Sequence, residues 1–215
     1  SGETEDYLVI DRPEGFVAAA QMGAIEFHVW GARTDNLEKP DRAVFDLDPG
    51  DGIDFDAVRH AAKAVRDFLS GLGLESAAMV TGGKGVHVIV PLRRTAGWET
   101  VTLFARTVAT IFAQAEPDRY VATMSKAKRK GKVFIDWLRN ERGSTAIAPY
   151  SVRSRPGARV AMPVTWRALG QLKAANSFTM RSGRERLARP CPLEEADADQ
   201  AITRDIIGKL EERAG

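Results

Sequence analysis

The 215-residue sequence contains a single cysteine, Cys191, which excludes a disulfide framework and a cysteine-rich zinc site and is compatible with a reducing cytoplasm. A long hydrophobic run is also missing, because the longest apolar stretch, residues 16–30, is interrupted by Gln21, Glu26 and His28. The net charge of +2 is too small to indicate nucleic-acid binding, so any basic surface must come from clustering. Repeats and low-complexity linkers are absent. We therefore expect a cytoplasmic protein without a membrane partner.

What remains is an ordinary globular composition, with 44% hydrophobic and 28% charged residues. The length suits one domain over 1–215. Periodicity predicts helices over 16–22, 98–115, 164–172 and 198–213, together with one that is capped by Asp54 or Asp56 and stopped by Gly71 and Gly73. It predicts strands over 25–30, 42–48, 77–80, 86–91 and 132–138, and an extended segment over 150–164. This mixture indicates a two-layer α/β sandwich whose mixed sheet is largely antiparallel.

Three aspartates stand at the ends of short apolar runs. Asp46 and Asp48 close the run that begins at Ala43, and Asp136 ends the run 133–135. A strand places alternate side chains on one face, so Asp46 and Asp48 project together. Carboxylates that close repel one another unless a cation lies between them. Hard carboxylate oxygens suit Mg²⁺ or Mn²⁺, so the pattern predicts a metal site.

Two other acidic-loop families fit less well, and a solvated acidic turn stays open as the simplest alternative. A calcium-binding EF-hand needs Asp or Asn where this chain has Gly50, and Glu where it has Ala57. A phosphatase of the haloacid dehalogenase type also begins with a strand that ends in Asp-x-Asp. That family continues with Gly-Thr, whereas this chain continues with Pro49 and Gly50, and no matching downstream acidic pair is visible.

A glycine-rich segment, 81–87, provides the second signal. Its three glycines allow backbone N–H groups to turn toward a ligand, Lys84 supplies charge and Thr81 supplies a hydroxyl. The spacing is not that of a Walker loop. An ordinary hairpin with an exposed lysine is the alternative, and His87, on a largely apolar strand, is equally explained as a buried core histidine.

Basic residues cluster on both sides of the acidic strand end. Five of them crowd the segment before Asp136, and three more follow on the next extended segment; these are Lys126, Lys128, Arg129, Lys130, Lys132, Arg153, Arg155 and Arg159. A charge run is usually a solvated loop. Here the position favours contacts to triphosphate oxygens and a nucleic-acid backbone. His28 is placed on a strand taken to neighbour that of Asp46, and His60 is assigned to the surface.

Together these residues resemble the polymerase domain of bacterial ligase D, a member of the archaeo-eukaryotic primase superfamily. The resemblance runs from about Tyr7 to the last helix. It is carried by five segments that occur in order at the family spacing, namely Ile25–Gly31, Val44–Gly50, Gly82–Val88, Phe134–Trp137 and Ala148–Arg153. It implies a primase-polymerase fold and template-directed addition of nucleotides, with a preference for ribonucleotides, to a DNA primer 3′-end.

The resemblance also implies roles for single residues. It implies that Asp46, Asp48 and Asp136 are catalytic and bind two divalent ions, Mn²⁺ or Mg²⁺. It places His28 near the nucleotide and assigns the triphosphate to the residues Thr81, Gly83, Lys84, His87 and Arg153. DNA contacts are expected from the loop residues Lys128, Arg129, Lys130 and Lys132.

The implied partners are nucleoside triphosphates, DNA ends with a 3′ overhang or gap, a DNA ligase and the end-binding protein Ku, in the bacterial nucleoid. Two departures from the family pattern stand out. Thr81 replaces the usual serine, and tens of residues that family members carry before the position of Tyr7 are expected to be missing. A haloacid-dehalogenase-like phosphatase and a non-catalytic DNA-end-binding module remain the alternative functions.

Overall fold

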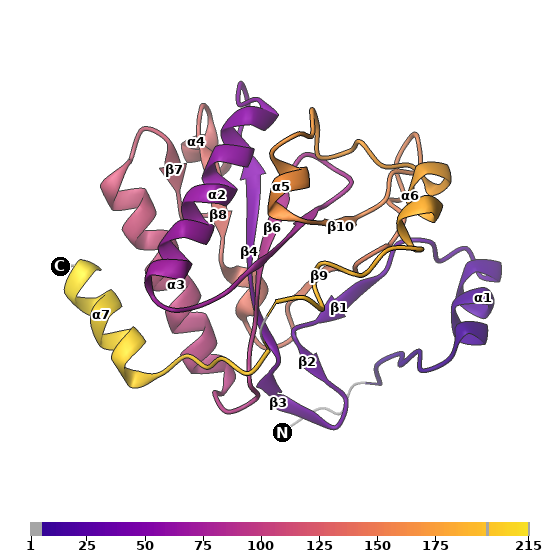
Figure 1. Ribbon diagram of the computed structural model, residues 1–215, viewed down its shortest axis with the longest axis horizontal. Coiled ribbons are helices and arrows are strands. Elements are labelled where there is room, and N and C mark those ends of the chain that lie inside the picture. The colour runs from indigo at the N-terminus through magenta and orange to yellow at the C-terminus, as the bar shows by residue number, and fades with distance from the viewer. Residues whose placement is uncertain (1–5, 197, 215) are drawn as a thin grey trace.

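The computed structural model describes residues 6–196 and 198–214 and is built around a six-stranded sheet (Figure 1). The strand order is β10-β5-β6-β4-β8-β7, and every pair is antiparallel except β7 with β8. The bounds are β4 Arg42–Pro49, β5 Ala77–Val80, β6 Val86–Pro91, β7 Tyr120–Val121, β8 Val133–Asp136 and β10 Met162–Val164. The predicted mixed, largely antiparallel α/β architecture is confirmed.

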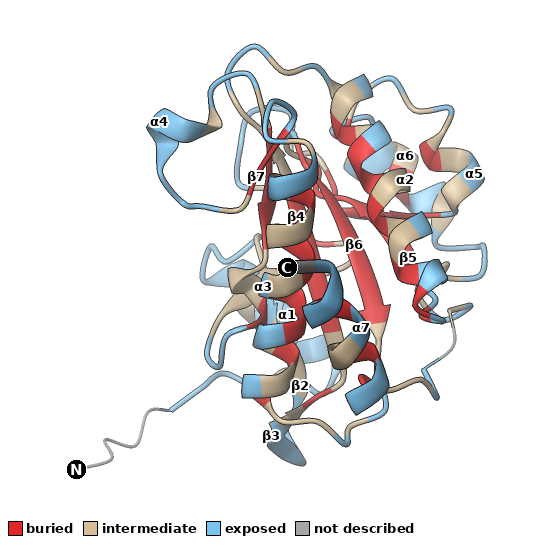
Figure 2. Cartoon of the chain, turned by 90° about the vertical axis from the view of Figure 1, so that its left-hand side faces the viewer, coloured by how far each residue is buried: buried red, intermediate tan, exposed pale blue. Residues whose placement is uncertain are grey.

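One face of the sheet carries the main hydrophobic core. Phe45 and Leu47 of β4 point to this face, and both side chains are fully buried. Two long amphipathic helices, α2 (Phe55–Gly71) and α3 (Trp98–Ala115), pack against it. Figure 2 shows the strands β4 and β6 almost wholly buried, whereas α2 is buried along one side only. These are the periodicities that the sequence predicts for a sheet covered by helices.

The opposite face is divided between a small apolar cluster and polar residues. Val44, Met79 and Ile89 pack against Ile147 of strand β9 (Thr145–Ile147). Strand β9 pairs with β1 (His28–Trp30) in a separate two-stranded sheet. Further along the same face of β4, toward its carboxyl end, aspartates replace the apolar residues. The site described below therefore lies on the face of the sheet opposite the one that α2 and α3 cover.

Several short elements differ from the sequence predictions. Residues 25–27 are not strand, and β1 does not join the main sheet, so the expectation that His28 lies on a strand next to that of Asp46 is wrong. The segment 150–164 is strand only at β10, apart from isolated bridges. The outer helices that are predicted over 16–22, 164–172 and 198–213 are observed as α1 Pro13–Gln21, α5 Trp166–Leu169 and α7 Arg204–Ala214.

Tertiary contacts account for the elements that periodicity did not predict, which are β2 Ala32–Arg33, β3 Asn36–Pro40, β7, β9, α4 Lys126–Arg129, α6 Met180–Arg186 and the 3₁₀ turn η1 Leu138–Asn140. Each is too short to show a period of its own. The start of α2 is settled by Asp54, whose side chain accepts a hydrogen bond from the Ala57 N–H (2.9 Å). Within the described residues, no helix combines the length and apolarity needed to cross a membrane.

Candidate active site

Strand pairing brings the predicted acidic residues together. Asp46 in β4 lies directly opposite Asp136 in β8 and, on its other side, opposite His87 in β6. Directly paired residues of antiparallel strands point to the same face, so the three side chains form a row across the sheet. Asp48, two residues further along β4, projects from the same face. Two predicted carboxylates therefore meet although 90 positions separate them in the chain.

Arg139 is the cation that these carboxylates contact. Its Nε lies 3.3 Å from Asp46 Oδ2, and its Nη2 lies 3.2 Å from Asp136 Oδ2. The 3₁₀ turn η1 that follows β8 carries Arg139 back over the strand end. The Leu138 N–H donates to Asp136 Oδ1 (3.0 Å) and fixes this turn. Arg139 was not among the predicted site residues, and its spacing of three residues from Asp136 was the available signal.

The three carboxyl groups differ in their pKa values. Burial and the neighbouring charges of Asp46 and Asp136 raise the pKa of Asp48 to about 6. Burial also raises the pKa of Asp136 above its usual value, against the opposing effect of Arg139. Burial acts in the same direction on Asp46, but the charges of His87 and Arg139 outweigh it and lower the pKa of that carboxyl. The surroundings thus hold one firmly ionised carboxylate beside two that resist ionisation.

The carboxylates suit a divalent ion by chemistry, although their side chains are not arranged as a ready site. Within the described part of the chain, no three His, Cys, Asp or Glu side chains form a group that could hold an ion as they stand. Asp46 Oδ1, however, is buried and has no hydrogen-bond partner, and His87 Nε2 lies 3.3 Å from it. An unpartnered buried carboxylate oxygen beside two acids of raised pKa favours a bound cation. The residues therefore fit the predicted metals.

A pocket of about 320 Å³ opens beside Asp46 and Asp48. Its walls carry most of the site residues that the sequence predicts, and these are His28, Asp46, Asp48, Thr81, Gly83, Lys84, His87, Arg129 and Arg153. Arg139 and Arg155 add two further cations to the wall. Asp136 does not line the pocket, but it contacts Arg139, which does. The combination of acids and several cations in one pocket suits a polyanionic ligand that carries divalent ions.

The predicted DNA-binding residues of the loop line two separate pockets. Arg129 faces the acidic pocket, with its guanidinium 3.6 Å from the centre of the Phe134 ring. Lys128, Lys130 and Lys132 instead line a separate groove of about 640 Å³ beside Tyr120. Helix α4, which carries part of this loop, projects from the body and is drawn largely as exposed in Figure 2. The structure therefore does not bring these three lysines to the carboxylates.

The glycine-rich hairpin lies close against the acidic strand. A Cβ atom at Gly85 would lie 2.7 Å from Asp48 Oδ1 and 2.8 Å from the Leu47 carbonyl oxygen, so a side chain there would displace the carboxylate. Gly82 has φ +69°, a conformation that favours glycine. The Thr81 hydroxyl donates to the Gly85 carbonyl (3.1 Å) and accepts from the Gly83 N–H (3.3 Å). These glycines therefore position the hairpin as one wall of the pocket.

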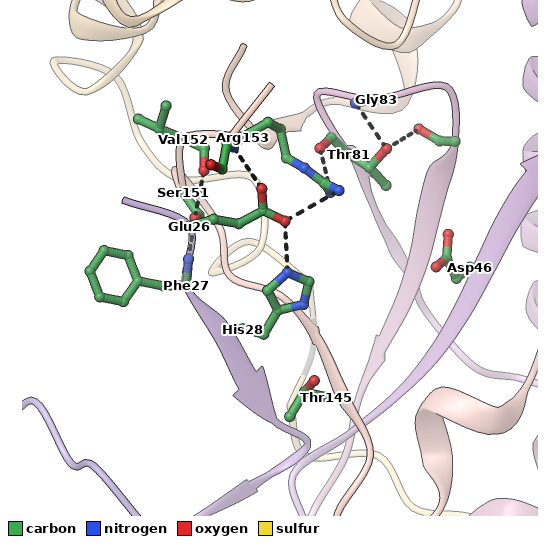
Figure 3. Close-up of polar contacts among 12 residues, drawn as sticks. Glu26, Phe27, His28, Asp46, Thr81, Gly83, Thr145, Ser151, Val152 and Arg153 are labelled. Carbon is green, nitrogen blue, oxygen red and sulfur yellow. Dashed lines mark hydrogen bonds and ion pairs between the residues drawn. The ribbon is translucent and has the colours of Figure 1, made fainter. Parts of the chain in front are cut away.

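A network around Glu26 forms the wall opposite Asp46 (Figure 3). Glu26 Oε1 lies 2.9 Å from His28 Nε2 and 3.3 Å from Arg153 Nη2. Arg153 also donates from Nη1 to the Thr81 carbonyl (3.3 Å), which joins it to the hairpin. Glu26 interrupts an apolar run and lies in the segment Ile25–Gly31 that carries the family resemblance, but no role was predicted for it, and its local sequence gives no signal of these contacts.

Comparison with known proteins gives consistent matches over most of the chain. A model of the LigD primase-polymerase domain matches residues 1–193. The multifunctional non-homologous end joining protein LigD of Pseudomonas aeruginosa is 41% identical over 200 residues, which cover 93% of this chain and 24% of that protein. The LigD protein of Mycobacterium bovis is 38% identical over 208 residues, which cover 93% of this chain and 27% of that protein.

A solved structure supports the same relationship. The polymerase domain from Mycobacterium tuberculosis ligase D in complex with DNA matches with a TM-score of 0.80 and 37% identity, covering 89% of this chain and 69% of that one. The chain spans about a quarter of the length of the curated relatives described above. A match of this extent in both sequence and fold shows that the chain belongs to the LigD primase-polymerase domain family, whose members are nucleotidyltransferases.

Proposed function

We propose that this chain transfers nucleotides from nucleoside triphosphates to the 3′-end of a DNA primer on a template. The observation that carries the proposal is the cross-strand row of Asp46, Asp136 and His87, with Asp48 near it, beside a pocket lined by several cations. Nucleotidyl transfer needs groups that bind a triphosphate and groups that favour attack by a hydroxyl. The pocket contains residue types suited to both tasks.

In this proposal Asp46, Asp48 and Asp136 hold two divalent ions, Mg²⁺ or Mn²⁺. Ions bound there supply the positive charge that lowers the pKa of an attacking hydroxyl and offsets negative charge on the phosphates. Asp46 lies at the centre of the row, where His87 and Arg139 offset its negative charge until ions bind. The ions would then take the place of Arg139 beside the carboxylates.

The triphosphate is assigned to the cationic residues of the pocket. Lys84 and Arg153 line it, and so does Gly83 of the glycine-rich hairpin. These donors are suited to the charge that builds up on phosphate oxygens when the bond to the leaving pyrophosphate breaks. His28 lines the same pocket and is oriented by Glu26. Arg129, Arg139 and Arg155 add positive charge along the path that a phosphate backbone would follow.

The proposed setting is repair of broken DNA by end joining. The curated relatives are non-homologous end joining proteins, and the solved relative is in complex with DNA. We propose that this chain fills gaps at DNA ends, with a preference for ribonucleotides, beside a DNA ligase and Ku. Lys128, Lys130 and Lys132 would then contact DNA from the groove outside the catalytic pocket. The family match argues against the phosphatase alternative.

Primer extension with Mn²⁺ and a labelled nucleoside triphosphate tests the proposal. We expect the wild-type protein to extend a primer on a template strand and Asp46→Ala to lose at least a thousandfold in rate while retaining its fold, as judged by circular dichroism. The exposed loop variant Asp51→Ala is the matched control and should extend normally. Binding to DNA ends without any incorporation by the wild type would instead support a non-catalytic end-binding module.

A further inference from the structure

We propose that Glu26 is a positioning residue of this pocket, whose carboxylate holds His28 and Arg153 in place for an incoming nucleoside triphosphate. This inference rests on the proposed function and names a residue beyond those that the function requires. Glu26 does not line the pocket, whereas both of its partners do. It therefore acts through them and does not contact the nucleotide.

Both carboxylate oxygens of Glu26 make polar contacts with neighbouring residues. Oε1 is shared between His28 Nε2 (2.9 Å) and Arg153 Nη2 (3.3 Å), and Oε2 accepts a hydrogen bond from the Ser154 N–H (2.7 Å). The side chain of Glu26 is 20% exposed and that of Arg153 is 13% exposed, so water competes weakly for these contacts. Figure 3 shows Glu26 between the other two side chains. Charge-assisted hydrogen bonds of this kind are among the stronger polar contacts in proteins.

These contacts connect three segments that are distant in the chain. Glu26 and Phe27 precede β1, and the Phe27 N–H donates to Ser151 Oγ (2.8 Å). Arg153 continues from Ser151 and reaches the Thr81 carbonyl of the glycine-rich hairpin. One carboxylate therefore sets the relative position of β1, the segment 151–154 and the hairpin. Its loss would loosen two walls of the pocket at once.

The negative charge of Glu26 also reduces the repulsion among the cations of the pocket. Arg153 shares the pocket with Lys84 and Arg155, and like charges at such a site repel one another until a polyanion arrives. Glu26 compensates this repulsion from behind the wall and takes no space from the ligand. Burial raises the pKa of Glu26, but the contacts with His28, Ser154 and Arg153 outweigh it and lower the pKa overall. Glu26 is therefore ionised at neutral pH.

The contact also fixes the orientation of the imidazole. Because Nε2 of His28 faces Glu26, Nδ1 is directed away from Glu26, toward the side on which Asp46 lies (Figure 3). A neutral ring that donates Nε2–H to the carboxylate leaves Nδ1 as an acceptor toward the pocket. Without Glu26 the exposed imidazole of His28 would be free to rotate, and Nδ1 would point toward the pocket in only some of its orientations.

The test substitutes Glu26→Gln, which keeps the side-chain length and an acceptor for the Ser154 N–H but removes the charge. Binding of ATP with Mn²⁺ and the kinetics of primer extension are measured. We expect the Kd for ATP and the KM for nucleotide to rise about tenfold while kcat stays within about threefold. Glu38→Gln is the matched control, because Glu38 pairs with Arg142 (2.7 Å) outside the pocket. It should bind ATP as the wild type does.

A double-mutant cycle separates positioning from general stability. In a protein that already carries His28→Ala and Arg153→Ala, adding Glu26→Gln should weaken ATP binding by less than about threefold, because its partners are gone. The proposal is overturned if Glu26→Gln binds ATP like the wild type, or if its full effect persists in the double variant. A wild type that binds ATP but incorporates nothing refutes the proposed function alone, and one that binds no ATP refutes both.

Discussion

Asp48 shows how the site opposes the stability of the fold. Its carboxyl is mostly buried beside Asp46 and Asp136, and its pKa is raised to about 6. An acid whose pKa is higher in the folded than in the unfolded state, where it is about 4, favours folding below about pH 4. That contribution is lost as the pH rises through 6. At neutral pH, without divalent ions, the folded protein therefore holds an unfavourable charge.

Asp48→Asn should consequently stabilise the protein while removing its activity. Above about pH 7 in EDTA we expect the free energy of unfolding to rise by about 2 kcal/mol relative to wild type, and the difference should vanish near pH 4. Urea denaturation at a series of pH values measures it. The control is Asp51→Asn, in the exposed part of the same loop. A pH-independent difference would show that Asp48 does not carry the raised pKa.

Arg139 opposes the effect of burial, because its positive charge favours the ionised form of the carboxyl groups of Asp46 and Asp136. It contacts Asp46, which lies 93 residues away in the chain, and Asp136, which lies three residues away. Its side chain is 36% exposed. Local sequence shows its spacing from Asp136 but not its contact with Asp46, because that contact depends on the register of β4 and β8. The same reason explains why Glu26 was missed, since its contact with Ser154 spans 128 residues.

Arg139→Met should lower the free energy of unfolding by about 2 kcal/mol in EDTA, because it leaves two buried carboxylates without their cation. Millimolar Mn²⁺ should restore most of this loss, since the ion replaces the missing charge. Arg142→Met, which breaks an exposed pair with Glu38, should change stability by less than about 1 kcal/mol and should not respond to Mn²⁺. Equal responses of the two variants to Mn²⁺ would contradict this account.

Among the elements, the turn η1 is tied to strand β4 by the side chain of Asn140. Asn140 is 2% exposed and pairs with the backbone of Val44 in β4, accepting from its N–H (2.7 Å) and donating to its carbonyl (2.7 Å). Strand β8 has already ended at Asp136, so the Asn140 side chain takes over the pairing that a longer strand would provide. It also donates to the Trp137 carbonyl (2.8 Å). In this way it holds the turn that carries Arg139.

Asn140→Ala should lower the free energy of unfolding by about 3 kcal/mol, because it leaves buried backbone groups of β4 without partners. Thermal and urea denaturation measure the loss. Asn36→Ala is the control, since its side chain accepts only an exposed N–H, that of Glu38 (3.2 Å). A change below about 1 kcal/mol for Asn140→Ala would mean that water or a local shift satisfies these groups.

Periodicity located the long elements well and the short ones poorly. The helix 98–115 and the strands 77–80 and 86–91 have the bounds that the sequence predicts, because each buries a complete stripe or run. The strand over 25–30 fails at its start, since Glu26 turns toward Arg153 and Ser154. Strand β1 pairs with β9 in a separate sheet, and the sequence of neither strand indicates that the two pair with each other.

For the whole molecule, the sequence motifs predicted which face of the sheet carries chemistry, because aspartates interrupt the apolar alternation only on one side of β4. They did not predict how the basic loop divides between two grooves, which depends on the packing of Arg129 over Phe134. That residues 1–215 form a single domain stays a prediction. The strands of the main sheet come from residues 42–164.

The most direct test of the central claim is the anomalous diffraction of crystals soaked with Mn²⁺ and a nucleoside triphosphate. We predict manganese peaks bound by Asp46 and Asp48, with Asp136 contributing and the Arg139 guanidinium withdrawn from both of its carboxylate partners. The triphosphate should lie against Lys84 and Arg153. Crystals with nucleotide in the pocket, no manganese at these aspartates and Arg139 still between Asp46 and Asp136 would contradict the account.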